Sequence, residues 1–202
     1  MKVYDAKNIR NIALLGHGAA GKTTLAEAAL YTSGAIGRMG KIENGNTKSD
    51  YLEDETNRQI SISTSLMQFE WGQCKINLID TPGYADFVGE VICGISAIDS
   101  VMILVDAVTG LEVGTETSWG ICEKNKTPRI LVINRTGKEH AATDDVLKSI
   151  QERFGIRALP IQIPVNPGIG FNKIVDFVSM KEYTYDVDGN GKGKAGDISD
   201  DM

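Results

Sequence analysis

Apolar side chains fall into runs along this chain that predict alternating strands and helices. Three runs, Ile12–Leu15, Val101–Val105 and Ile130–Ile133, are short and consist of apolar residues. Such runs are typical of strands that are buried on both faces of a parallel sheet. Helical spacing of apolar residues occurs in four segments: Lys22 to the residue before Ser33, Ala85–Ile98, Thr115–Lys124 and a segment that starts at Thr143. Strands that alternate with helices predict an α/β fold with a mostly parallel, doubly wound sheet.

A β-hairpin is predicted between the first two helices. Ile60–Leu66 alternates apolar and hydroxyl side chains, Trp71–Gln73 has the composition of a turn, and Lys75–Ile79 alternates again. Before this hairpin, residues 35–59 have no apolar periodicity and are rich in Gly, Asn, Asp, Glu and Lys. A loop of this length inside a compact domain is usually functional or disordered.

The hydrophobic pattern changes after Ala158. Leu159–Val165 alternates, a second short strand is predicted near Lys173–Val178, and a third near Tyr183–Val187. These segments predict a small antiparallel sheet appended to the core. Residues 189–202 are mostly Gly, Lys and Asp with almost nothing to bury, which predicts a flexible end. The expected division is therefore a core at 1–157, the start of an inserted subdomain at 158–188 and a tail at 189–202.

Composition narrows the class of protein. The chain has 202 residues, of which 42% are hydrophobic and 24% charged, as in an ordinary globular domain. Its net charge of −6 argues against a protein that coats nucleic acid, and no direct sequence-specific nucleic-acid binding is expected. No apolar run approaches the roughly 20 residues of a membrane span, and the N-terminus does not read as a signal peptide. The three cysteines are scattered without metal-ligand spacing, which suits a reducing cytosol. A soluble, cytoplasmic protein is therefore expected, and nothing in the sequence demands more than a monomer.

A glycine-rich loop follows the first predicted strand and opens the first predicted helix. Its residues are Gly16, His17, Gly18, Ala19, Ala20, Gly21, Lys22, Thr23 and Thr24. This spacing, G-x-x-x-x-G-K-[ST], is that of a phosphate-binding loop, whose backbone N–H groups surround phosphate oxygens at a helix N-terminus. Lys22 would reach the β- and γ-phosphates and the Thr23 hydroxyl would hold Mg²⁺. The alternative is a strand-to-helix turn that merely needs glycines. His17 is expected to be structural, because side chains of such loops usually point away from the phosphates.

A second phosphate motif comes directly after an apolar strand. Asp80 could bind Mg²⁺ from the end of that strand, and the N–H of Gly83 could meet a γ-phosphate. Alone, the pattern D-x-x-G is common as a simple turn. In this order after the phosphate-binding loop, it points to a nucleotide switch, and residues 35–59 lie where such switches place their first mobile segment.

The motifs together resemble those of translational GTPases, most closely the N-terminal GTPase domain of elongation factor G and its bacterial paralogues. The resemblance rests on four blocks in order: Gly16–Thr24, Arg58–Ile62, Asp80–Phe87 and Val105–Gly110. It extends to Pro160–Pro164, which in that family leads into a subdomain inserted in the GTPase domain. The resemblance implies a P-loop fold, GTP and GDP as ligands, Mg²⁺, hydrolysis of GTP, and the ribosome as partner of the full-length factor.

The resemblance also implies roles for individual residues. Ser61 stands where the family has the threonine that closes over Mg²⁺ and the γ-phosphate; the alternative is that Ser61 is only an outward-facing strand residue. The second-switch contacts are Asp80, Thr81, Pro82, Gly83 and Tyr84. The expected catalytic residues are Lys22, Gly83 and Tyr84, and the expected metal ligands are Thr23, Ser61 and Asp80.

The chain departs from the family pattern at three places. Tyr84 stands where the family often has a histidine that orients the attacking water, so its role is either to position water or only to pack as an aromatic. After Ile130–Ile133 the family has Asn-Lys-x-Asp, which reads guanine, whereas this chain has Asn134, Arg135, Thr136 and Gly137. Loss of the aspartate would cost about 2–5 kcal/mol of guanine binding, unless Glu139 replaces it. Ala19 replaces an acidic residue of the loop.

No base-binding Ser-Ala loop and no closing strand and helix are recognised after residue 158, so the chain is expected to be part of a longer factor. Two functions remain open. One is a GTPase of the elongation-factor-G type; the other is a degenerate nucleotide-binding module with weakened guanine specificity and slow or no hydrolysis. A vestigial loop is a third alternative, against which the intact block Gly16–Thr24 argues.

Overall fold

The computed structural model describes residues 2–155, 158–186 and 189–199. The chain divides into two compact units, which are described separately. The first comprises the residues up to Val105 together with Glu112–Val132, and the second comprises Asp106–Leu111 and the residues from Ile133 onward. The predicted boundaries at residues 157 and 188, the end of the third predicted strand at Val187 and the last residues of the predicted tail lie outside the described residues.

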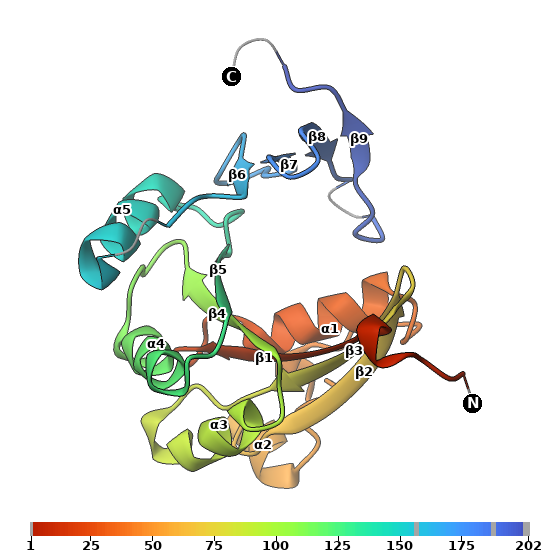
Figure 1. Cartoon of the computed structure of the whole chain (residues 1–202), viewed down its shortest axis with the longest axis vertical. Helices are drawn as coiled ribbons and strands as arrows, with labels where there is room; N and C mark the ends of the chain where they lie inside the picture. Colours follow the sequence, from red (N-terminus) through yellow and green to blue (C-terminus); the bar gives the residue numbers. More distant parts are fainter. Residues whose placement is uncertain (1, 156–157, 187–188, 200–202) are drawn as a thin grey trace. The chain divides into compact units, whose positions relative to one another are not determined.

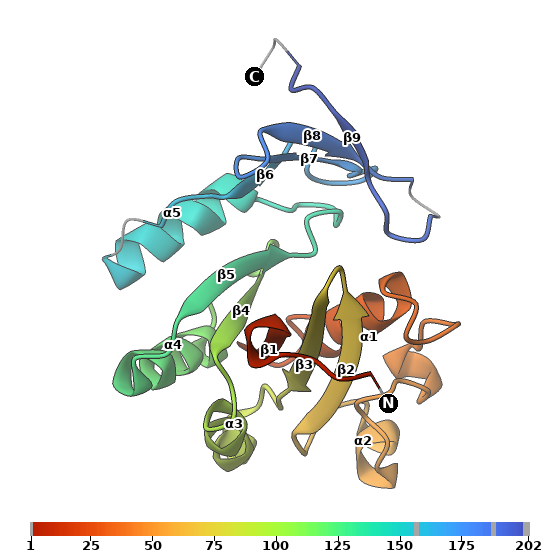
Figure 2. The same ribbon diagram turned by 45° about the vertical axis from the view of Figure 1, so that its right-hand side comes forward.

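The first unit is built on a five-stranded sheet. Its strands are β1 (Ile9–Gly16), β2 (Ser65–Trp71), β3 (Cys74–Asp80), β4 (Ser100–Asp106) and β5 (Arg129–Asn134). They follow the order β2-β3-β1-β4-β5, with β1 parallel to β3 and β4 and β2 antiparallel to β3. Figure 2 shows the β2–β3 hairpin at one end of this sheet. The expected mostly parallel α/β fold is therefore confirmed.

Helices cover both faces of the sheet, which explains why the strands have continuous apolar runs. On one face, α1 (Lys22–Thr32) contributes Ala26 and Leu30 to a core that includes Leu14 of β1. On the other face, α3 (Val88–Ile95) and α4 (Val113–Asn125) pack on Ala13 and Leu15 of the same strand (Figure 1). Successive residues of β1 thus enter the cores on opposite faces of the sheet, so the residues that point to either face must be apolar.

The segment before the hairpin differs from its prediction. Residues 35–59 contain a 3₁₀ turn at Ile42–Asn44 and a short helix, α2 (Glu53–Arg58). The strand predicted at Ile60–Leu66 is wrong in position, because the strand begins at Ser65. The N–H groups of Ile62 and Ser63 instead donate to the buried carboxylate of Glu55, each at 3.0 Å. The predicted helix at Ala85–Ile98 is also shorter, with a 3₁₀ turn at Ala85–Phe87 before α3.

The second unit contains α5 (Thr143–Phe154) and a four-stranded antiparallel sheet. Its strands are β6 (Gln162–Pro164), β7 (Lys173–Asp176), β8 (Lys181–Thr184) and β9 (Lys194–Gly196), in the order β6-β7-β8-β9. The small antiparallel sheet was predicted, but β9 lies in the segment expected to be flexible. All three residues of β9 are exposed, so the segment has no alternation of apolar and polar residues that would have predicted a strand. Among the described residues, no helix is long and apolar enough to cross a membrane.

Candidate functional site

The loop between β1 and α1 is a tight turn that requires glycine at two positions. Gly16 has a φ of 135°, and a Cβ on it would lie 2.5 Å from the carbonyl oxygen of Leu104 on the adjacent strand. Gly21 has a φ of 92° and precedes α1, whose N-terminus has no side-chain cap. Backbone N–H groups at such a helix start attract anions. The geometry is therefore that of the phosphate-binding loop predicted from the sequence.

Lys22 is buried inside this loop. Its Nζ donates hydrogen bonds to the carbonyl oxygens of Gly16, at 3.0 Å, and His17, at 2.8 Å. Burial lowers the pKa of Lys22 from 10.5 to about 8, against the opposing effect of the Asp80 and Asp50 carboxylates. An ammonium group in this position gains free energy from a neighbouring anion, because the anion offsets the cost of its burial.

The three predicted metal ligands lie together. The Thr23 hydroxyl donates to Oδ2 of Asp80 at 2.7 Å and lies 3.1 Å from the Ser61 hydroxyl. Oδ1 of Asp80 is a buried atom that has no hydrogen bond within the part of the chain that the structure describes. Hydroxyl and carboxylate oxygens are the ligands that Mg²⁺ prefers, so this cluster fits that ion.

Asp50 joins this cluster, although the sequence analysis did not single it out. Its Oδ1 accepts a hydrogen bond from the Ser61 hydroxyl at 2.8 Å. Burial raises the pKa of the Asp50 carboxyl above its usual value, while the Ser61 hydrogen bond acts in the opposite direction. Asp50 is one of several acidic residues in residues 35–59, and no local pattern distinguishes it from the others.

The buried carboxylate of Asp80 allows a prediction about the stability of the chain without nucleotide. Burial raises the pKa of Asp80 from 3.8 to about 6, so the folded chain binds this proton more tightly than the unfolded chain. Between these pKa values the free energy of unfolding falls as the pH rises. Above them, the ionised carboxylate costs about 3 kcal/mol. Asp80→Asn should therefore stabilise the nucleotide-free chain at neutral pH, as measured by thermal unfolding without Mg²⁺.

The stabilisation by Asp80→Asn should be complete near about pH 7 and vanish near about pH 4. The matched control is Asp54→Asn, because Asp54 is an exposed carboxylate on α2. A difference between wild type and Asp80→Asn that does not change with pH would contradict the raised pKa.

Three carboxylates hold the segment that carries Asp50 and Ser61: those of Glu27 and Glu55, which are buried, and that of Glu90, which is half-buried. Glu27 of α1 accepts hydrogen bonds from the backbone N–H groups of Gly40 and Lys48. Glu55 accepts from Leu52, in addition to Ile62 and Ser63. Glu90 of α3 accepts from the N–H of Thr64 at 2.8 Å. These carboxylates fix residues 40–64 beside Thr23 and Asp80 through the backbone of the segment.

The second motif lies directly against the phosphate-binding loop. Thr81 is fully buried, and its hydroxyl donates to the carbonyl oxygen of Leu14 at 2.7 Å. A Cβ on Gly83 would lie 2.3 Å from Nζ of Lys22 and 2.6 Å from the backbone nitrogen of Gly18. No side chain therefore fits at position 83, and Gly83 brings its backbone to the end of the Lys22 side chain. Pro82 is buried beside it.

His17 contacts α4. Its Nδ1 accepts a hydrogen bond from the N–H of Gly114 at 3.2 Å, and its Nε2 lies 3.5 Å from a carboxylate oxygen of Glu112. A Cβ on Gly114 would lie 2.6 Å from the Cα of His17, so helix and loop meet only because position 114 is glycine. These contacts support the expectation of a structural role for His17. Ala20 is buried, while Ala19 and Thr24 are exposed.

The predicted base-reading residues belong to the second unit. Arg135 has a φ of 62°, and its Nη1 donates to the buried carboxylate of Asp106 at 2.8 Å. The carbonyl oxygen of Thr136 accepts from the N–H of Gly168 at 2.7 Å, and that of Asn134 accepts from Ala107. Gly137 offers no side-chain acceptor. Glu139 is exposed and lies 3.8 Å from His140, which is exposed as expected.

Comparison with known proteins places this geometry in a family. Residues 7–192 match the model of the elongation factor Tu GTP binding domain. Elongation factor G of Mycoplasma genitalium is 37% identical over 92% of the chain, which covers 27% of that protein. The mitochondrial ribosome-releasing factor 2 of Anopheles gambiae is 36% identical over 97% of the chain, again covering 27% of that protein.

A solved structure from Thermus thermophilus has the same fold. It is 33% identical to this chain and superimposes with a TM-score of 0.87 over 96% of the chain, which covers 28% of that protein. The chain thus spans about a quarter of the length of these relatives. The family model covers nearly all of the chain, and the chain therefore belongs to the elongation factor Tu GTP binding domain family.

Proposed function

We propose that this chain binds GTP with Mg²⁺ and hydrolyses it to GDP and phosphate, as the GTPase domain of a ribosome-associated elongation factor. The observation that carries the proposal is the cluster of Thr23, Ser61 and Asp80 beside the buried amino group of Lys22. The hydroxyl and carboxylate oxygens of this cluster can bind Mg²⁺, and the Lys22 ammonium can bind the phosphates. The names of the relatives, which include elongation factor G and ribosome-releasing factor 2, support the ribosome as partner.

In this proposal the chain acts mainly by positioning charge. The backbone N–H groups of Gly16–Thr24 and the Lys22 ammonium bind the β- and γ-phosphates, and the N–H of Gly83 meets the γ-phosphate. Thr23, Ser61 and Asp80 would hold Mg²⁺, which would supply positive charge to the phosphate oxygens. A water molecule attacks the γ-phosphorus. The bond between the γ-phosphorus and the bridging oxygen breaks, and that oxygen leaves with GDP. Tyr84 orients that water.

The remaining expectations belong to the same proposal. Residues 1–157 form the nucleotide-binding core, 158–188 the start of an inserted subdomain, and 189–202 a tail. The factor acts in the cytoplasm of a bacterium and this domain is a monomer. The guanine base is contacted by Asn134, Arg135, Thr136 and Gly137.

Dependence on Mg²⁺ tests the proposal. The affinity for a fluorescent GTP analogue should rise with Mg²⁺ in the wild type, and Ser61→Ala should lose most of that rise, on the order of tenfold. Ser63→Ala is the control, because Ser63 lies in the same segment and only its backbone N–H makes a contact recorded in the structure. Phosphate release should accelerate when ribosomes are added to a factor that contains this domain. Binding that is indifferent to Mg²⁺, or release that ribosomes leave unchanged, would refute the proposal.

A further inference from the structure

Gly18 is a glycine whose backbone does not require glycine. Within the phosphate-binding loop, Gly16 and Gly21 have φ values of 135° and 92°, in the left-handed region or beyond it, where a side chain is strained. Gly18 is not among the residues with positive φ. A positive φ is therefore not the reason for glycine at this position, and we look for the reason in the surroundings of Gly18.

A side chain at position 18 would first meet the ring of Tyr84. A Cβ on Gly18 would lie 2.8 Å from Cζ of Tyr84 and 3.0 Å from both Cε1 and Cε2. The three nearest atoms thus all belong to the hydroxyl-bearing end of the ring. Carbon atoms that are not bonded approach to about 3.5–4.0 Å, so a methyl group at position 18 and the ring in this place exclude each other.

The backbones on either side are already fixed. Gly83 lies against the backbone nitrogen of Gly18 and the end of the Lys22 side chain, and the side chain of Thr81 is anchored to β1. The Tyr84 ring, in contrast, is 41% exposed and can swing toward solvent. A side chain at position 18 would therefore displace the ring and leave both backbones in place.

We propose that Gly18 is a positioning residue for Tyr84: its missing side chain forms the seat that holds the phenol end of Tyr84 on the phosphate-binding loop. The seat places the Tyr84 hydroxyl at the phosphate end of the site. Its consequence for catalysis rests on the proposed function, in which Tyr84 orients the attacking water. The contact between Gly18 and the Tyr84 ring does not depend on hydrolysis, so it is tested in an experiment separate from the kinetic one.

The position of the ring is tested by ¹⁹F NMR on the whole chain with 3-fluorotyrosine in place of its six tyrosines. Loss of one signal in Tyr84→Phe assigns Tyr84. Gly18→Ala should shift that signal more than any other, with and without GDP. Gly120→Ala is the matched control, because a Cβ on Gly120 of α4 meets nothing within 4 Å. An unchanged Tyr84 signal in folded Gly18→Ala would overturn the seat.

The catalytic consequence is tested by a double-mutant cycle on GTP hydrolysis. With Tyr84 present, Gly18→Ala should lower kcat on the order of 10-fold to 100-fold, while the KM for GTP changes less than about threefold. In the Tyr84→Ala background the same substitution should change kcat less than about twofold. Equal losses in both backgrounds would show that Gly18 acts without Tyr84 and would overturn the inference. If the wild type hydrolyses no GTP, the proposed function fails, and the NMR result still decides whether the seat exists.

Discussion

Lys22→Ala is expected to weaken binding of GTP and GDP on the order of 100-fold or more. The Lys22 amino group is buried, and within the described residues it donates to the carbonyl oxygens of Gly16 and His17 and is influenced by nearby carboxylates. A polyphosphate is a far stronger partner for a buried cation than two neutral carbonyl oxygens. The substitution removes the cation that pairs with the polyphosphate and leaves the N–H groups of the loop unchanged.

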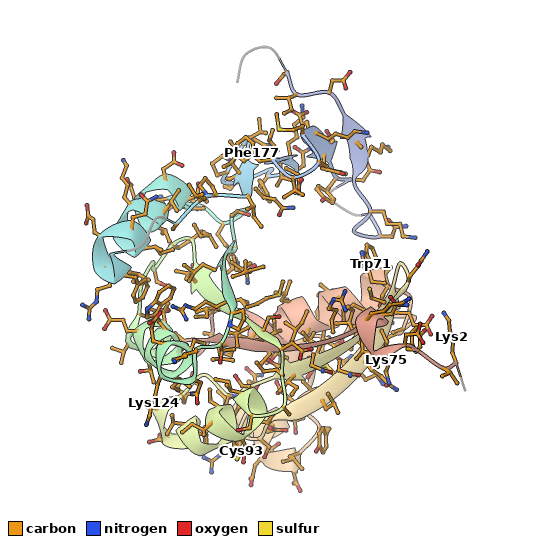
Figure 3. The ribbon with its side chains drawn as sticks, viewed as in Figure 1. Lys2, Trp71, Lys75, Cys93, Lys124 and Phe177 are labelled. Carbon is orange, nitrogen blue, oxygen red and sulfur yellow. The ribbon has the colours of Figure 1, made fainter. Side chains whose placement is uncertain are left out.

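Titration with a fluorescent GDP analogue measures this loss. Lys124→Ala is the matched control, since Lys124 is an exposed lysine in the last turn of α4 (Figure 3). Its affinity should equal that of the wild type within about twofold. If Lys22→Ala retains wild-type affinity, the loop does not bind phosphates and the proposed function is wrong.

Gly137→Asp is expected to strengthen the preference of the chain for guanine. Guanine presents two N–H donors at its N1 and 2-amino positions, which in the family meet an aspartate, and position 137 now offers no acceptor. A charged acceptor for two desolvated donors contributes about 2–5 kcal/mol, or about 30-fold to several thousandfold in affinity. A Cβ at position 137 would lie 3.6 Å from Cβ of Phe171, an ordinary contact, so the aspartate fits.

Competition among GTP, ATP and XTP measures this preference. The wild type should bind GTP less than about tenfold better than ATP, and Gly137→Asp should widen that ratio while disfavouring XTP, which has an oxygen in place of the 2-amino group. Gly120→Asp adds the same charge at an exposed helix position with open space around it and serves as the control. A wild type that prefers GTP at least tenfold would show that another group, such as Glu139, reads the base.

The sequence predicted the parts of the site that depend on neighbouring residues. Gly16 and Gly21 are required by local backbone geometry, and Asp80 follows the apolar strand that places it, so each has a signature within a few positions. Asp50 was missed because its role depends on a hydrogen bond to Ser61, eleven residues away. An acidic side chain in a polar loop has no periodicity that reveals such a contact.

The same limit explains the misplaced strand. Ile60–Leu66 has the period-two pattern of a strand, but Glu55 takes the N–H groups of Ile62 and Ser63 that a sheet would otherwise use. A buried carboxylate thus overrides the local pattern, and pairing begins only at Ser65 opposite Asp80. Strand β9 was missed for the opposite reason, since its exposed residues carry no apolar signal.

Within the described residues, the carboxylates that hold residues 40–64 accept hydrogen bonds from main-chain N–H groups, and this determines which substitutions the segment tolerates. Every amino acid except proline supplies an N–H group, so Glu27, Glu55 and Glu90 constrain the path of the segment and not its side chains. Positions 48 and 62 should tolerate many residues but reject proline, whereas at position 64 the threonine hydroxyl also donates to the carbonyl oxygen of Glu90. Position 40 should tolerate fewer residues, because a Cβ there would lie 2.6 Å from the carbonyl oxygen of Asn46. Related chains can therefore vary the surface of this segment while Ser61 and Asp50 remain in the same place.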